Sequence, residues 1–159
     1  MRRNSASSRC PQRAFTLVEV VLVIAIAAVI SAMAMPRYGE SLARYRASLA
    51  AKRVASDLAL VQARARSMGT TRSITFNSLQ SSYSLTGETG LIDSQSTYSV
   101  TLGTDPYFAT IVSINFGGAS AISFNGYGVP SQGGTIVLRS GTAQRTVTLE
   151  AISGQTTIQ

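Results

Sequence analysis

The sequence predicts an α+β fold, in which one long N-terminal helix packs on a C-terminal antiparallel β-sheet domain. Two observations support this prediction. Apolar residues dominate the first third of the chain and then recur at intervals of three or four, which is typical of a helix. From Gly69 onward, Thr, Ser, Gly and β-branched residues dominate and apolar and polar residues alternate, which is typical of strands. With 159 residues, the chain has room for one domain.

The first 14 residues form a basic leader. They contain Arg2, Arg3, Arg9 and Arg13 and no acidic residue, so much of the net charge of +7 lies here. The basic composition is therefore poor evidence for nucleic-acid binding. The only cysteine, Cys10, also lies in this leader, and the chain has no histidine. A chain cut after Ala14 would have no thiol.

An apolar segment follows the leader. Between Val20 and Met35 there is no charge, and Ser31 is the only polar side chain. Together with Phe15–Glu19 this gives about 20 residues, or about 30 Å of helix, which is enough to cross a bilayer. The basic N-terminal flank predicts that this end stays in the cytoplasm. One acidic residue, Glu19, lies near the start of the segment.

Three interpretations of this segment compete. A secretory signal would be cleaved after Ala34, in the small-x-small sequence Ala32-Met33-Ala34, and would release a soluble β-rich binding module. A plain transmembrane anchor would explain the length and the arginines. Both leave Glu19 unexplained, because a carboxylate inside a span costs about 2.5–3.5 kcal/mol.

The third interpretation explains Glu19. A cut between Ala14 and Phe15 would create an amino group at Phe15, one helical turn before Glu19. In a bundle of subunits, Glu19 of one chain could neutralise the terminal amine of its neighbour. The acid would then set the register of the assembly, as a buried polar residue does in a coiled coil.

The stretch "RAFTLVEVVLVIAIAAVISAMAMPRY" (13–38) resembles the N-terminus of type IV prepilins and type II secretion pseudopilins. Phe15, Thr16, Leu17, Val18 and Glu19 match the family's Phe-Thr-Leu-(Ile/Val)-Glu pattern. The resemblance implies that prepilin peptidase cuts between Ala14 and Phe15 and N-methylates Phe15. It also implies a helix bend at Pro36. The family normally has Gly where this chain has Ala14, and we expect processing to occur with this small residue.

The helical pattern resumes after Pro36. Seven apolar residues recur mostly at intervals of three or four and predict one buried face: Leu42, Tyr45, Leu49, Leu58, Val61, Ala65 and Met68. Gly69 is the predicted stop. The basic residues between positions 44 and 66 are interpreted as a solvated helix face rather than a nucleic-acid site, because they lack interleaved aromatic residues.

Alternating stretches after Gly69 predict eight strands. They are 70–76 and 82–88, expected to pair, then 97–102, 109–116, 121–128, 134–140, 145–152 and 155–159. Short turns between most of them favour antiparallel neighbours. Residues 88–96 are expected to form a loop. The predicted organisation is a leader (1–14), a transmembrane or filament-core helix (15–36), an amphipathic helix (37–69) and a β-rich domain (70–159).

The C-terminal half is similar to the end of the GspH/FimT subgroup of minor pilins. Phe124 and Gly128 match the subgroup's turn, 136–138 and 147–149 match its strands, and Gly154 matches its final glycine. Some members bind DNA through arginines after that glycine. Here residues 155–159 contain no cation, and phosphate contacts supply most non-specific DNA affinity. We therefore rank DNA uptake below secretion or pilus assembly.

No catalytic, cofactor or metal site is predicted. The mature chain would lack histidine and thiol, and Asp93 and Asp105 are too few for a calcium site. Tyr83, Tyr98, Tyr107 and Tyr127 are interpreted as sheet or core residues rather than nucleophiles. The chain is therefore not expected to be an enzyme.

Taken together, the residues and the resemblance predict a type IV pilin-like fold and a minor pilin or pseudopilin. Its expected partners are other pilins and prepilin peptidase. The expected location is the bacterial inner membrane, with the N-terminus in the cytoplasm and the β-rich domain in the periplasm. The alternatives are a major pilin, a DNA-uptake minor pilin, and the secreted module released after Ala34.

Overall fold

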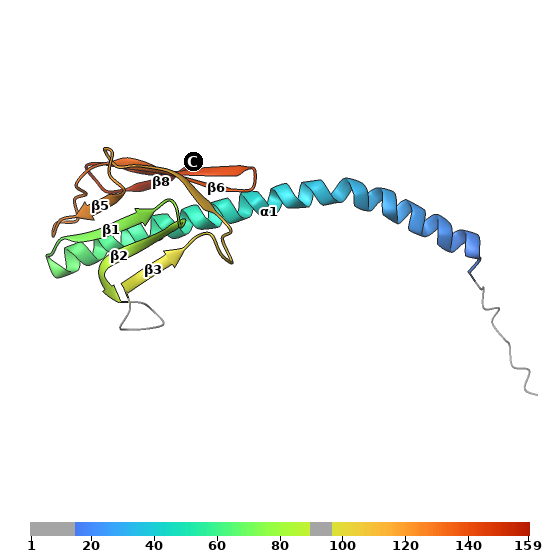
Figure 1. Cartoon of the computed structure of the whole chain (residues 1–159), viewed down its shortest axis with the longest axis horizontal. Helices are drawn as coiled ribbons and strands as arrows, with labels where there is room; N and C mark the ends of the chain where they lie inside the picture. The colour runs from blue at the N-terminus through green and yellow to red at the C-terminus, as the bar shows by residue number, and fades with distance from the viewer. Residues whose placement is uncertain (1–14, 90–96) are drawn as a thin grey trace, which may run out of the picture. The chain divides into compact units, whose positions relative to one another are not determined.

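One long helix, α1 (Leu17–Met68), precedes all the strands that the structure describes (Figure 1). The computed structural model describes residues 15–89 and 97–159, and the side chains of all of these except 33–36 and 88–89. The chain divides into two units, Met1–Arg37 and Tyr38–Gln159. The described part of the first unit is Phe15, Thr16 and the N-terminal part of α1. The second unit contains the rest of α1 and every described strand, so the α+β prediction is confirmed.

The C-terminal end of α1 has the glycine stop that the sequence predicts. Gly69 has a left-handed backbone with φ 61°, which glycine adopts without a side-chain clash. The Gly69 N–H donates to the Arg66 carbonyl (3.3 Å), and the Thr70 N–H donates to the Ala65 carbonyl (3.2 Å). These two bonds form a Schellman motif, which pairs carbonyls that the last helical turn would otherwise leave unsatisfied.

The strands form two antiparallel sheets. The first has the order β3-β2-β1-β5 and the second β4-β6-β7-β8. Their bounds are β1 (Arg72–Asn77), β2 (Ser82–Thr89), β3 (Thr97–Thr101), β4 (Thr110–Asn115), β5 (Ala121–Phe124), β6 (Gly134–Ser140), β7 (Ala143–Leu149) and β8 (Thr156–Ile158).

Most predicted strands are confirmed, including the pairing of β1 with β2. The strand predicted for 121–128 is wrong in length, because β5 ends at Phe124. The Asn125 side chain there accepts hydrogen bonds from the N–H groups of Tyr127 and Val129 (3.0 Å each), which turns the chain. The strand predicted for 145–152 also ends early, at Leu149, before a turn at 151–153. β2 reaches Thr89, and 90–96 of the expected loop lie outside the described residues.

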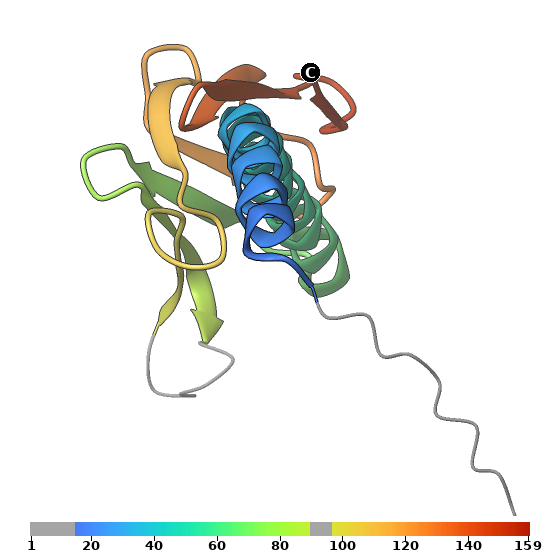
Figure 2. The ribbon, with the colours of Figure 1, turned by 90° about the vertical axis from the view of Figure 1, so that its right-hand side faces the viewer.

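Both sheets pack on the part of α1 that belongs to the second unit. Figure 2 shows the strands around this segment, with β1 to β3 coloured green to yellow and β6 to β8 coloured orange to red. The core draws its side chains from the helix and from both sheets, with Leu58, Phe76, Phe116, Phe124 and Leu138 among the buried ones. The described members of this core all lie between Ala50 and Leu149. The second unit therefore has a hydrophobic core that needs no residue from the first.

The buried face of α1 differs from the predicted one. Leu58, Val61 and Ala65 are buried as expected. Tyr45 and Met68 were predicted wrongly, since 65% and 49% of their surfaces are exposed. Four small or β-branched residues take the place of the large ones in the first half of the face: Ala47, Ala50, Ala51 and Val54. Small side chains let the strands approach the helix closely, which leaves no room for a tyrosine.

Candidate assembly site

The start of α1 holds the residues that the sequence singled out. Thr16 precedes the first helical residue and acts as the N-cap, because its Oγ1 accepts a hydrogen bond from the Glu19 N–H (3.2 Å). The Thr16 carbonyl accepts the first helical bond, from Val20 N–H (3.2 Å). Thr16 and Glu19 thus have the spacing of a capping box, a pattern that the sequence reasoning missed.

Phe15 and Glu19 lie on the same side of this helix end. Together with Val20, Val23 and Ile24 they line one apolar hollow. Phe15 and Val20 occupy the positions of a hydrophobic staple, in which the residue before the N-cap packs near the fourth helical residue. Ala14, the other residue of the expected cleavage site, lies outside the described residues. The structure therefore places Phe15 and Glu19 beside the same hollow, and their roles in cleavage and assembly stay predictions.

The apolar side chains that the structure describes in the first unit are exposed on all sides. Phe15, Leu17 and Val18 each expose more than 70% of their surface. By length and composition, α1 contains a segment apolar enough to cross a membrane, and none of that segment is buried within the protein. The Ser31 hydroxyl donates to the Ala27 carbonyl (2.7 Å), so this polar group is satisfied within the helix. A surface of this kind requires lipid or other apolar helices around it.

Pro36 is the remaining N-terminal residue to which the sequence assigned a role. It lies inside α1 and the helix continues through it, one residue before the end of the first unit. The bend expected at Pro36 stays a prediction.

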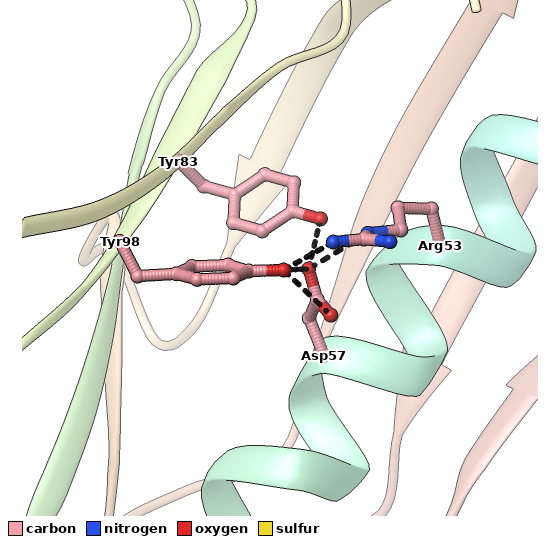
Figure 3. Close-up of polar contacts among 4 residues, drawn as sticks. All are labelled: Arg53, Asp57, Tyr83 and Tyr98. Carbon is pink, nitrogen blue, oxygen red and sulfur yellow. Dashed lines mark hydrogen bonds and ion pairs between the residues drawn. The ribbon is translucent and has the colours of Figure 1, made fainter. Parts of the chain in front are cut away.

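A polar cluster of Arg53, Asp57, Tyr83 and Tyr98 links α1 to the first sheet in the second unit (Figure 3). Asp57 is buried and accepts hydrogen bonds from the hydroxyls of Tyr83 (2.6 Å) and Tyr98 (3.1 Å), which come from β2 and β3. Arg53, one turn before Asp57, donates through Nε to the same carboxylate (3.2 Å) and through Nη2 to the Tyr98 hydroxyl. A buried carboxylate is tolerated because all these donors surround it.

The cluster changes the pKa values of three of its members, Arg53, Tyr83 and Tyr98. Burial and the bond to Asp57 raise the pKa of Tyr83, and burial together with the Asp57 charge raises the pKa of Tyr98. Burial lowers the pKa of Arg53, but the charge of Asp57 together with the interactions of Tyr98 and Tyr83 more than offsets this, so the net shift is upward. The Arg53 guanidinium therefore stays charged and the two phenols stay neutral. The cluster joins helix to sheet and offers no free nucleophile.

Sequence reasoning missed this cluster because it treated the residues separately. Arg53 was assigned to a solvated face, yet its side chain is only 34% exposed. Tyr83 and Tyr98 are buried as expected, whereas Tyr127 is 86% exposed and the prediction for it was wrong. The i, i+4 spacing of Arg53 and Asp57 was the available signal. Among the residues that the structure describes, no group of three or more His, Cys, Asp or Glu could hold a metal ion.

A second linkage brings together the three C-terminal positions of the GspH/FimT resemblance. The Gln62 amide of α1 donates to the carbonyls of Gly128 and Ser153 (2.8 Å each). Gly154 has φ 70°, and a Cβ there would lie 2.4 Å from Gln62 Nε2 and 3.3 Å from the Phe124 ring. Glycine is therefore required at position 154 both by its backbone and by the approach of α1. Gln62 was not predicted.

The chain matches two known families. Residues 9–35 match the Prokaryotic N-terminal methylation motif. Residues 50–154 match the family Type II transport protein GspH. No curated protein matches the chain.

Solved structures of a minor pilin have a similar fold. The type IV minor pilin FimU of Pseudomonas aeruginosa strain PAO1, in a crystal of space group P21, superposes with a TM-score of 0.56 at 14% sequence identity. The match covers 73% of this chain and 90% of the FimU chain. A second crystal form of FimU, in space group P65, matches with a TM-score of 0.49 at 15% identity, over 70% of this chain and 91% of that one.

The GspH match spans more than half of the chain and includes the Arg53–Asp57 cluster, Gln62 and Gly154. The methylation motif covers the apolar start of α1. The chain belongs to the GspH family of type II transport proteins, with a prepilin-type N-terminus and a pilin-like fold.

Proposed function

We propose that this protein is a minor pseudopilin, a structural subunit that joins other pilin-like subunits in a type II secretion pseudopilus or a type IV pilus. The observation that carries the proposal is the order of two features in one chain: a prepilin-type methylation motif over 9–35, followed by a GspH domain over 50–154. The soluble module released after Ala34 is not favoured, because cleavage there would remove nearly all of the methylation motif from the mature protein. The proposed role is structural and needs no catalytic residue.

Processing by prepilin peptidase would convert the start of α1 into an assembly site. Cleavage between Ala14 and Phe15 would leave an N-methylated ammonium at Phe15, one turn from the Glu19 carboxylate. Both are costly in lipid when alone, and pairing between neighbouring subunits would neutralise them. The exposed apolar residues of the first unit would supply the packing surface around that pair.

Before assembly, the same segment would hold the subunit in the inner membrane. The arginines of residues 1–14 would keep the N-terminus in the cytoplasm, and the second unit would fold in the periplasm. Pro36 would bend the helix between the two environments, because proline removes one helical hydrogen bond. DNA uptake has less support, since residues 155–159 contain no cation.

The pairing role can be separated from helix capping by two substitutions at one position. Glu19→Gln keeps a side chain that can complete the capping box but removes the charge, whereas Glu19→Ala removes both. We expect both variants to insert into the membrane and both to be depleted from sheared filaments. The measurement is the ratio of filament-bound to membrane-bound protein on immunoblots.

A matched control is Glu40→Ala, which removes an exposed acid elsewhere on α1. It is expected to enter filaments like the parent protein. Normal incorporation of Glu19→Gln would show that the charge is not used in assembly, and the pairing proposal would have to be abandoned.

A further inference from the structure

One end of the second unit carries exposed aromatic residues beside arginines. Tyr38 and Tyr45 are 71% and 65% exposed on α1, and Phe108 is 46% exposed on the loop between β3 and β4. The Arg46 guanidinium lies 4.5 Å from the centre of the Phe108 ring, and Arg44 precedes Tyr45. We call these five residues, Tyr38, Arg44, Tyr45, Arg46 and Phe108, the aromatic–arginine rim.

Phe108 is held in its exposed position by the backbone. Its φ is 43°, a left-handed conformation that a bulky residue rarely adopts. The buried Ser140 hydroxyl donates to the Phe108 carbonyl (2.9 Å) and fixes the loop against β6. Strained positions that the surrounding structure maintains are often functional. An apolar ring kept half in solvent by such a conformation points to a contact that the isolated chain lacks.

The turn between β6 and β7 lies at the same end of the unit. A side chain at Gly141 would lie 3.2 Å from the Ala43 Cβ, so this turn abuts the same stretch of α1 as the rim. Arg139 and Arg145 flank the turn. Among the side chains that the structure describes, the acids at this end are Glu40, which pairs with Arg44 (3.5 Å), and Asp105 in the β3–β4 loop. The described residues of this end thus include four arginines and two acids, which gives them a net positive charge.

The rim is close along the chain to the segment that would cross the membrane. Tyr45 comes eight positions after Arg37, which limits their distance to about 28 Å even if the chain were fully extended. Tyrosine, phenylalanine and arginine side chains are suited to the headgroup region, where one part of the side chain is apolar and another is polar. The short chain segment between Arg37 and Tyr45 keeps the rim near the membrane surface, so its effective concentration there is high and even a weak affinity for lipid is enough for binding.

We propose that the aromatic–arginine rim binds the second unit to anionic phospholipid headgroups before the subunit enters a filament. This inference rests on the proposed membrane anchoring of the first segment. The rings of Tyr45 and Phe108 would enter the headgroup layer, and Arg44 and Arg46 would pair with lipid phosphates. This contact with lipid would hold the periplasmic unit at the membrane surface, where other subunits are anchored.

The chain contains no tryptophan, so one introduced tryptophan reports on one position. Full-length Phe108→Trp is placed, one chain per disc, in lipid discs that contain phosphatidylglycerol brominated near the headgroup. Tyr127→Trp is the matched control, because Tyr127 is an exposed aromatic whose carbonyl is held by Arg66, 20 residues and about 30 Å of helix beyond Arg46.

We expect strong quenching of the tryptophan fluorescence in Phe108→Trp and none in Tyr127→Trp. Quenching in Phe108→Trp should weaken in phosphatidylcholine discs and at high salt, since 1 M salt shortens the Debye length to about 3 Å. Adding Arg46→Gln should lower the ratio of lipid-bound to unbound protein about five-fold, in line with one surface arginine. Adding Arg66→Gln should change nothing.

Equal quenching in the two variants, or quenching that ignores lipid charge, would overturn the proposal. So would the absence of quenching, which would leave a neighbouring protein subunit as the partner of the rim. The readout does not require cleavage or filament assembly. Its failure is therefore distinguishable from a failure of the proposed pseudopilin function, which is measured by incorporation into filaments.

Discussion

Replacing Asp57 with alanine removes the carboxylate that joins α1 to β2 and β3. Three groups lose their acceptor: the hydroxyls of Tyr83 and Tyr98 and the guanidinium of Arg53. Breaking a buried ion pair by removing one partner typically costs about 3–5 kcal/mol. The Arg53 side chain is 34% exposed, so water can replace part of what it loses. We therefore expect a decrease of about 3 kcal/mol in the free energy of unfolding.

The assay is urea denaturation of the fragment 38–159, followed by circular dichroism. A loss of about 3 kcal/mol would lower the midpoint by about 2 M at an m-value typical of a domain of this size. Glu40→Ala is the matched control, because Glu40 is an exposed acid on the same helix whose pair with Arg44 is solvated. Its effect should stay within about 0.5 kcal/mol.

A double-mutant cycle tests whether the cluster acts as a unit. Asp57→Ala and Tyr83→Phe should be less than additive when combined, because they remove the same hydrogen bond. If Asp57→Ala cost no more than Glu40→Ala, the buried carboxylate would not hold helix and sheet together, and the reasoning would be wrong.

Three further outcomes follow. Tyr83 and Tyr98 have raised pKa values in the fold, so above pH of about 10 the unfolded chain releases protons that the native chain keeps. The free energy of unfolding should therefore fall as pH rises above that value, by up to about 1.4 kcal/mol per pH unit for each tyrosine. Tyr83→Phe should reduce this dependence on pH, which urea denaturation at a series of pH values measures. Gly154→Ala should destabilise by about 1–3 kcal/mol, because a Cβ would meet Gln62. Gly118→Ala is its control: φ is also positive at 92°, but no atom lies within 4 Å, so its loss of thermal stability should be smaller. Finally, the fragment 37–159 should bind duplex DNA weakly in a shift assay, and tight, salt-sensitive binding would favour the uptake alternative.

Local patterns account for what the sequence predicted well. The glycine stop at Gly69, the change from helical to alternating periodicity, and the β1–β2 pairing all depend on residues close together in the chain. The methylation motif was recognisable for the same reason. Such features are determined by backbone preference and by the period of apolar side chains.

Features that depend on distant residues were not predicted. The return of β5 to pair with β1 divides the strands into two sheets, and no spacing between neighbouring strands indicates it. The burial of Ala47 and Ala50 instead of Tyr45 follows from how closely the sheets approach α1. The contacts of Asp57 with Tyr83 and of Gln62 with Gly128 span 26 and 66 residues, so single-residue chemistry could not reveal them.

The candidate assembly site was predictable in part. The spacing of Phe15 and Glu19 gave their shared side of the helix, whereas the role of Thr16 as N-cap was overlooked although its signal was local. Glu19 has a role at the helix start even before cleavage. Its backbone N–H donates the capping bond to Thr16, and a carboxylate in the first turn is favoured by the helix dipole. This is why Glu19→Gln, rather than Glu19→Ala alone, separates capping from assembly.

The central claim is that a new N-terminus at Phe15 meets Glu19 of a neighbouring subunit. The most direct measurement is mass spectrometry of the N-terminal peptide of protein purified from membranes of cells with active prepilin peptidase. The account predicts a peptide that begins with N-methylated Phe15. An N-terminus at Met35, or an intact leader ending in Ala14, would contradict it.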